Sequence, residues 1–305
     1  MIGTSGWRGD RGVGGRARGD RRGHRRSWPL VAVWKGCAAL AAMLLALSAA
    51  HPLAAQPADT LARSPDPLFT RNDAMAAGIF TIATVAAFPL DKLFSDYAQG
   101  SIQERRFAQR VAVVVEEIAE PGAFLIGFSM YAVGRLAKND EVADLGLHGT
   151  EAILVGLGLT MGLKVLAGRA RPYLGRDDPH NFGFLRGWKN RDYTSFPSGH
   201  TLIAFAAASA VTEETRRFWP NSVWLVGTAM YGGAALVGWS RMYDNKHWMS
   251  DVVVGGALGV FAGRKVVRYH HTHPGNTLDR WLLGVAIMPS GKAGYSWRPI
   301  IVPQR

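Results

Sequence analysis

The chain has 305 residues, of which 48% are hydrophobic, and a formal net charge of +12 at pH 7. This length suits one large domain or two small ones, and the apolar share is sufficient for a sizeable core. Because the only cysteine is Cys37, near the N-terminus, the sequence excludes a disulfide framework and a cysteine-ligated metal centre.

The first 35 residues carry much of the positive charge, with eight arginines and one lysine against Asp10 and Asp20. Such an arm can bind nucleic acid, but an apolar run of fifteen residues follows Lys35 directly. A basic segment, an apolar run and small residues near Ala50 are typical of a secretory signal. We therefore expect residues 1–55 to be a basic arm plus a signal peptide, or an uncleaved anchor, and we expect no nucleic-acid partner.

The remaining chain predicts an all-α helical bundle. Proline-rich residues 56–72 indicate a linker, and about six core helices are expected within residues 73–275. Their apolar stretches lie near 74–90, 111–136, 144–168, 199–215, 221–240 and 249–268. No stretch alternates with period two over a useful length. The tail, residues 276–305, has short β-like pieces near Pro289 and predicts an irregular segment or a hairpin.

The lengths of these stretches do not decide whether they cross a membrane. A crossing helix needs about 20 apolar residues, and by this measure only 74–90 and 221–240 are long enough. Uncharged runs of twelve residues begin at Ala152, Thr201 and Val252. The early stop of the second run at Glu213 weighs against a crossing.

Two polar clusters at predicted helix ends contain candidate anion ligands. In "KVLAGRARP", Lys164 and Arg171 are two helical turns apart and are expected on one side of a helix that ends before Pro172. In "PSGH", Ser198 suits an N-cap and Gly199 allows close approach to the backbone, while the free amides of a helix start bind anions. Taken singly, each cluster is also typical of an ordinary helix end.

A third cluster, "SRMYDNKHWMSD", contains a candidate histidine–carboxylate pair. His247 and Asp251 are four residues apart, so a helix would place the carboxylate against the imidazole. That contact fixes the ring tautomer, although a single pair of this kind is also a common structural hydrogen bond. Arg241 adds a bidentate anion donor.

Together the three clusters favour phosphoryl chemistry. Cations and helix-start amides neutralise the oxygens of a phosphoryl transition state. One neutral histidine can attack phosphorus, and a second can protonate the leaving oxygen. No acidic cluster suited to Mg²⁺ accompanies them, so we expect neither a metal nor any other cofactor.

The spacing Lys-x6-Arg-Pro, Pro-Ser-Gly-His and Ser-Arg-x5-His-x3-Asp over residues 164–251 resembles the type 2 phosphatidic acid phosphatase and vanadium haloperoxidase superfamily. The resemblance implies a helical bundle with the motifs gathered at one end. It implies that His247 is the nucleophile that forms a phosphohistidine, that Asp251 orients it, and that His200 is the general acid. The implied phosphate ligands are Lys164, Arg171, Ser198, Gly199 and Arg241.

The same residues also allow other functions, but they support these less well. A Ser198–His247–Asp251 esterase would leave the three cations unexplained and lacks a Gly-x-Ser-x-Gly turn. A vanadium-dependent haloperoxidase can use the same ligands, because vanadate resembles phosphate. In a structural membrane protein the polar residues would only cap helices. The "HHTH" run at His270–His273 can bind a metal or simply be solvated.

We therefore expect a metal-independent phosphatase of the phosphatase branch, acting on a lipid such as phosphatidic acid or a polyprenyl pyrophosphate. A soluble periplasmic acid phosphatase is the alternative. We expect export to the bacterial cell envelope and membrane association, with the site facing the periplasm. If the signal is cleaved and all six stretches cross, Arg171 and His200 fall on the cytoplasmic side. Either one stretch does not cross, with 111–136 the best candidate, or the bundle is not transmembrane.

Overall fold

The computed structural model describes residues 69–99, 106–175, 177–273, 285–290 and 294–299. The basic arm, the export signal and nearly all of the linker lie outside the described residues. The main helices are α2 (Arg71–Ala87), α3 (Asp91–Gln99), α4 (Arg106–Glu117), α5 (Ala123–Ala137), α6 (Asp140–Ala167), α7 (Arg186–Lys189), α8 (Gly199–Phe218), α9 (Val223–Tyr243) and α10 (Met249–Thr272). The predicted all-α bundle is confirmed, and helices occupy five of the six predicted core stretches as single elements.

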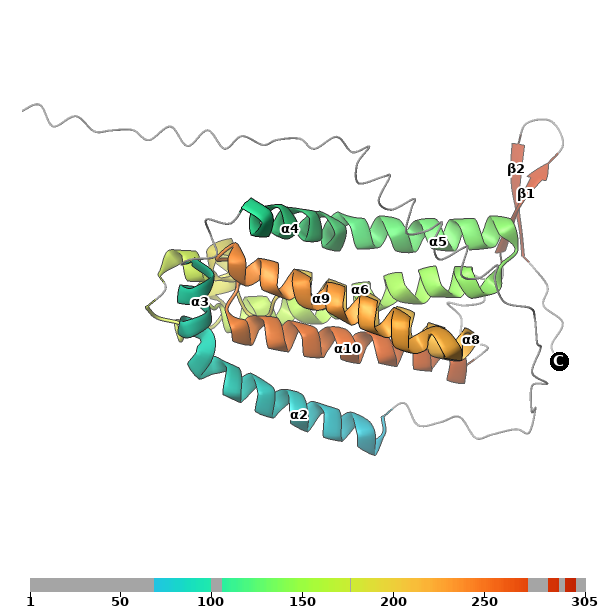
Figure 1. Cartoon of the computed structure of the whole chain (residues 1–305). Helices are drawn as coiled ribbons and strands as arrows, with labels where there is room; N and C mark the ends of the chain where they lie inside the picture. Colours follow the sequence, from blue (N-terminus) through green and yellow to red (C-terminus); the bar gives the residue numbers. More distant parts are fainter. Residues whose placement is uncertain (1–68, 100–105, 176, 274–284, 291–293, 300–305) are drawn as a thin grey trace, which may run out of the picture.

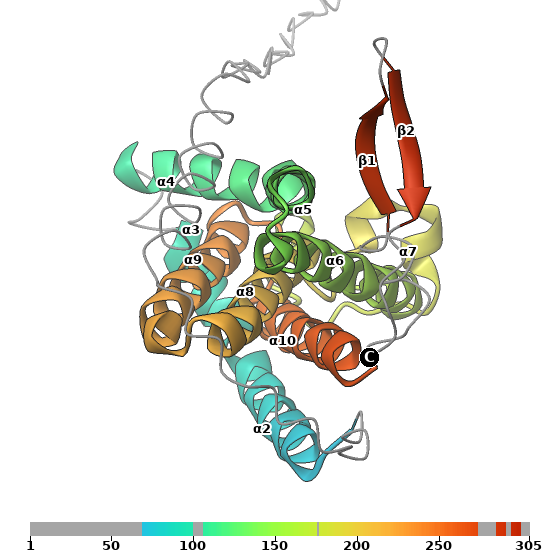
Figure 2. The same ribbon diagram turned by 90° about the vertical axis from the view of Figure 1, so that its right-hand side faces the viewer.

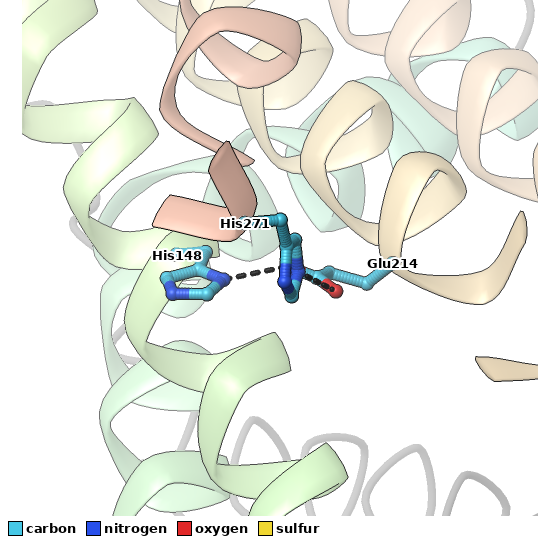
Figure 3. Close-up of side chains that lie close together, drawn as sticks. All are labelled: His148, Glu214 and His271. Atoms are coloured by element: carbon cyan, nitrogen blue, oxygen red, sulfur yellow. Dashed lines mark hydrogen bonds and ion pairs between the residues drawn. The ribbon is translucent and has the colours of Figure 1, made fainter. Parts of the chain in front are cut away.

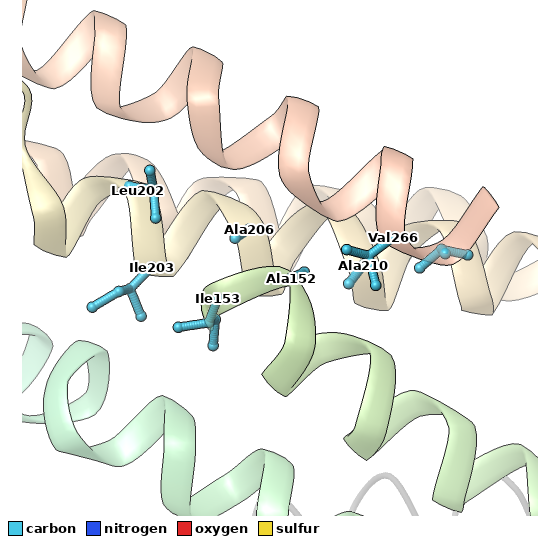
Figure 4. Packing of buried hydrophobic residues seen from close by; sticks show 8 residues of the cluster. Ala152, Ile153, Leu202, Ile203, Ala206, Ala210 and Val266 are labelled. Carbon is cyan, nitrogen blue, oxygen red and sulfur yellow. The ribbon is translucent and has the colours of Figure 1, made fainter. Parts of the chain in front are cut away.

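The helices run up and down along one common axis, so that the ends of some helices lie beside the starts of others (Figure 1). Seen along this axis, α8 lies between α6, α9 and α10, and α2 packs on the outside against α10 (Figure 2). The shared core contains Ala152 and Ile153 of α6, Leu202 and Ile203 of α8, and Val266 of α10 (Figure 4). Helix α8 is thus the centre of the bundle.

Three glycines allow α10 to approach α8 closely. A Cβ atom added at Gly255, Gly259 or Gly263 would lie 2.4, 2.5 or 2.7 Å from a backbone oxygen of α8. The glycines recur every four residues, so they form one stripe on the helix, and small residues of this kind let two helix backbones meet. This contact fixes the start of α8 beside the start of α10.

The predicted stretch 111–136 is two helices rather than one. Helix α4 ends at Glu117 and α5 begins at Ala123, with Pro121 in the turn between them. Proline has no amide hydrogen and collides with the preceding turn, so it interrupts a helix. Glu120, with φ −153° and ψ 116°, is extended at this point. The break carries its carboxylate to the same end of the bundle as the predicted site.

Apolar side chains cover outward faces of the bundle as well as its core. On α2, Met75, Ile79 and Ile82 are 66%, 62% and 71% exposed. Among the described residues, two helical segments are long and apolar enough to cross a membrane, Arg71–Gln99 and Asp140–Leu174. The first agrees with the sequence prediction. The second segment was not predicted from the sequence to be long enough. The stretch 221–240, which was predicted, does not meet this test of length and hydropathy.

The predicted β-like tail is confirmed as a hairpin. Strands β1 (Val285–Ser290) and β2 (Gly294–Pro299) pair antiparallel, with Val285 opposite Pro299.

Candidate active site

The predicted site residues come from helix ends that meet at one end of the bundle (Figure 1). The end of α6, the start of α8, the end of α9 and the start of α10 supply them. The amide of Ser198 donates to the backbone oxygen of Asp251 at 3.0 Å, which joins the second and third clusters directly. A Cβ atom at Gly199 would lie 3.7 Å from Cε of Lys164, which joins the first and second.

His247 is buried in the connection between α9 and α10. Its Nδ1 lies 2.7 Å from the backbone oxygen of Ser195 and 3.7 Å from Oδ2 of Asp251. A carbonyl oxygen only accepts hydrogen bonds, so Nδ1 carries the proton and Nε2 keeps its lone pair. Burial lowers the pKa of His247 to about 3, and the charge of Lys164 adds to this effect against the opposing carboxylate of Asp251. The ring is therefore a neutral base at pH 7.

The contact between His247 and Asp251 does not arise as predicted. Helix α10 begins at Met249, so His247 precedes it, and Trp248 is the N-cap residue. The carboxylate of Asp251 turns back to accept from the Trp248 amide at 2.9 Å and from Ser195 Oγ at 2.5 Å. A helix start, rather than the side of a helix, therefore positions the pair.

Lys164 and Arg171 converge by a turn of the chain, not on one helix face as predicted. Helix α6 ends at Gly168, which has φ +54°, a conformation that glycine adopts without strain. Arg171 then follows in extended conformation. Lys164 Nζ donates to the Thr194 backbone oxygen at 2.8 Å, and Arg171 Nη2 to Thr194 Oγ1 at 3.3 Å.

Ser198 and Gly199 form the predicted helix start, but Ser198 does not cap it with its side chain. Its Oγ lies 2.8 Å from Oγ1 of Thr201, in a fully buried hydroxyl pair. The first amides of a helix have no intrahelical acceptors, so the start of α8 keeps its ability to bind an anion.

Two arginines of the site carry buried donors that lack acceptors. The Nε–H groups of Arg171 and Arg241 have no hydrogen-bond partner in the described part of the chain. Buried donors are nearly always satisfied in folded proteins. An anionic ligand between these arginines would satisfy both.

The comparisons with known proteins agree with this geometry. Residues 147–274 match the PAP2 superfamily. The matched segment is less than half of the chain. The match begins within α6, so helices α2–α5 precede it.

Two curated relatives are similar to parts of the chain. A lipid A 1-phosphatase of Porphyromonas gingivalis is 39% identical over 84 residues, which are 28% of this chain and 18% of that protein. An undecaprenyl-diphosphatase of Sulfolobus acidocaldarius is 29% identical over 137 residues, 44% of this chain and 63% of that protein. Each match therefore spans less than two thirds of the relative.

A solved structure shares the fold. It is described as a transmembrane PAP2 type phosphatidylglycerolphosphate phosphatase from Bacillus subtilis, with a TM-score of 0.51 and 20% identity. The likeness covers 66% of this chain and 97% of that chain. The helical-bundle fold is thus shown independently of the sequence motifs.

Arg169 is a central residue of the site that the sequence analysis did not single out. Its fully buried guanidinium donates to Asp251 Oδ1 and to Asp91 Oδ2, both at 2.6 Å. It also donates to the Pro179 backbone oxygen and lies over the Phe182 ring at 4.9 Å. The only sequence signal is its place in the first cluster, two residues before Arg171.

Two glutamates near the interruption between α4 and α5, which precede the matched segment, also contact residues of the site. Glu116 pairs with Arg241 at 2.8 Å and with Lys246 at 3.3 Å, and Glu120 lies 3.3 Å from Nε2 of His200. The sequence analysis did not single out these glutamates and noted only that the stretch 111–136, which contains them, is the best candidate not to cross a membrane. Their partners are 80 or more residues away along the chain, so local spacing gave no signal.

The Arg169 contacts predict a large loss of stability for Arg169→Gln. The substitution leaves Asp91 and Asp251 buried without a counter-charge, and breaking a buried pair in this way costs about 3–5 kcal/mol. Chemical unfolding of the purified protein measures the loss. The matched control is Lys92→Gln, which removes an exposed pair with Asp177 and should leave stability nearly unchanged. Equal effects of the two substitutions would contradict a structural role for Arg169.

Proposed function

We propose that this chain is a phosphatase that transfers a phosphoryl group from a lipid phosphate or diphosphate to His247 and then to water. The observation that carries the proposal is the state of His247. Its imidazole is buried and neutral, its Nδ1 is held by Ser195 and Asp251, and the described residues form no hydrogen bond to its Nε2. A neutral ring fixed in this way among cations suits a nucleophile for an anionic centre.

In the first step, the lone pair of His247 Nε2 attacks phosphorus while the bond to the leaving oxygen breaks. Lys164, Arg171, Arg241 and the start of α8 stabilise the phosphoryl oxygens. As the ring becomes positively charged, the carboxylate of Asp251 stabilises it, and Arg169 keeps that carboxylate ionised.

His200 supplies the proton for the leaving oxygen. Its Nε2 lies 3.3 Å from a carboxylate oxygen of Glu120. Burial and the neighbouring cations, Arg241 first, lower the pKa of His200 to about 4, and the negative charge of a bound phosphate opposes this shift and favours the protonated ring. In the second step His200 accepts a proton from water, whose oxygen attacks phosphorus as the bond to Nε2 breaks. Inorganic phosphate leaves, and both histidines return to their starting states.

Two observations support a lipid substrate. Both curated relatives are named for phosphorylated lipids, lipid A and undecaprenyl diphosphate. In addition, an exposed apolar patch adjoins the site on the segment between α6 and α8. It contains Tyr173, Leu174, Phe182, Phe184, Leu185 and Trp188. Phe184 and Trp188 are 78% and 79% exposed, and large aromatic side chains of this kind are typical of membrane interfaces.

The apolar outer faces of the bundle support membrane association, with the site on the periplasmic side. The opposite end carries Arg216, Arg217, Arg264 and Arg268, and basic residues are retained on the cytoplasmic side.

Replacing the proposed nucleophile tests the reaction. His247→Ala should lower hydrolysis of an aryl phosphate by at least about 10³-fold, as loss of a nucleophile does in other enzymes. His180→Ala is the control, because His180 is exposed on the same end and stacks only on Phe88. Unchanged hydrolysis by the His247 variant would eliminate the proposed mechanism.

The apolar patch predicts a selective effect of Trp188→Ser. Removing one large apolar side chain from a membrane contact should slow hydrolysis of a lipid phosphate in vesicles roughly tenfold. The rate with a soluble aryl phosphate should stay the same. Trp224→Ser, at a comparably exposed tryptophan of α9, serves as the control. A soluble periplasmic phosphatase would show no difference between the two substrates.

The orientation can be tested by labelling single cysteines. In a Cys37→Ser background, Lys189→Cys at the active-site end should react with a membrane-impermeant maleimide in intact cells or spheroplasts. Asn221→Cys, in the connection between α8 and α9, should react only after lysis, because both positions are exposed but lie at opposite ends. The reverse pattern would refute the periplasmic orientation, and release of the protein by carbonate would refute the crossing.

A further inference from the structure

A second polar cluster lies at the end of the bundle opposite the active site. His148 of α6, Glu214 of α8 and His271 of α10 bring their side chains together there (Figure 3). Nδ1 of His148 lies 2.5 Å from Oε1 of Glu214, and Nε2 of His271 lies 2.9 Å from Oε2. At 1.5 Å per residue, the cluster is about 20–24 Å from Lys164 and His200 along α6 and α8. It is therefore separate from the catalytic groups.

We propose that His148, Glu214 and His271 form a binding site for a divalent transition-metal ion, with Zn²⁺ as the best match. Their potential ligand atoms all lie within 4.8 Å of one another. Two imidazole nitrogens and one carboxylate are the donor set of zinc centres that keep one coordination position open. Ligands at about 2.0–2.2 Å in tetrahedral geometry are roughly 3.3 Å apart. The two imidazole–carboxylate contacts, at 2.5 and 2.9 Å, need to lengthen by less than about 1 Å to reach this spacing.

The surroundings favour a bound cation. Glu214 is fully buried and His148 is 1% exposed, so the carboxylate is held away from water. Asp144, one turn before His148, interacts electrostatically with all three residues and adds a second negative charge. Two carboxylates and two neutral imidazoles balance the charge of one divalent ion.

Neighbouring groups would hold the ligands in place and admit a fourth. The His148 ring stacks on His270 at 4.3 Å between centroids, and His270 in turn contacts Glu151 at 2.5 Å. Such second contacts orient metal-binding histidines. His271 lines a cavity of about 600 Å³ that reaches the cluster from outside. Arg217 and Arg268 also line this cavity and would favour water or an anion as the fourth ligand.

The site also clarifies the "HHTH" run. Sequence alone left open whether these histidines bind a metal or are solvated. The structure buries His270, so solvation is wrong for that residue. Of the four positions, only His271 contributes to the cluster, with its other ligands supplied by α6 and α8.

Metal binding by the full chain, prepared without a histidine tag and stripped with EDTA, tests the proposal. The wild type should bind one Zn²⁺ that His271→Ala binds at least tenfold more weakly, since even losing a residue that supports a ligand weakens a metal site by about 10–100-fold. His273→Ala is the matched control at the same helix end, outside the cluster. Zn²⁺ should raise the thermal unfolding midpoint of the wild type and of the control only.

A second measurement keeps the test independent of how well the variant folds. Co²⁺ bound to the wild type in place of Zn²⁺ should show the visible absorption of a tetrahedral ion with nitrogen ligands. Absence of this spectrum, absence of Zn²⁺ binding, or equal binding by the wild type and a folded His271→Ala variant would overturn the proposal. These readouts do not depend on phosphatase activity, so they stand apart from the proposed function.

Discussion

The buried ion pairs of Arg169 hold the active-site end of the molecule together. This one guanidinium joins Asp91 of α3 to Asp251 of α10, and it also fixes the connection between α6 and α8 through Pro179. Three fully buried charges are tolerable only because each is satisfied by short hydrogen bonds. Every other feature of the site is built on this arrangement. Asp251 in turn fixes Ser195 and the start of α10, and Ser195 fixes the ring of His247.

The cations of the site are positioned before any phosphate is present. Glu116 contacts Arg241 and Lys246, and Glu120 contacts His200, so carboxylates of the α4–α5 interruption already compensate part of the positive charge. A phosphate that enters must compete with Glu116 for Arg241, whereas Glu120 can stay beside His200. The buried Nε–H groups of Arg171 and Arg241 remain available to the ligand. The arrangement therefore limits repulsion among the cations and leaves these N–H donors available to bind the substrate.

Sequence reasoning identified the bundle and the three polar clusters because both depend on short-range patterns. Apolar periodicity is local, and so is the spacing from Pro197 to His200. The local geometry was less accurate, because His247 precedes its helix and Arg171 follows the turn at Gly168. Arg169, Glu116 and Glu120 were missed for a different reason. Their roles come from partners on other helices, and no spacing within one segment reveals such pairs.

The close contact between α8 and α10 limits how the two polar ends can influence each other. Gly255, Gly259 and Gly263 place the α10 backbone directly against α8, so neither helix can slide along the other without a collision. A ligand at Glu214 and His271 therefore cannot act on His200 and His247 by shifting one helix. It can only hold the far ends of α6, α8 and α10 together. Because the same helices supply the catalytic groups, a metal there would stabilise the geometry of the active site rather than switch it.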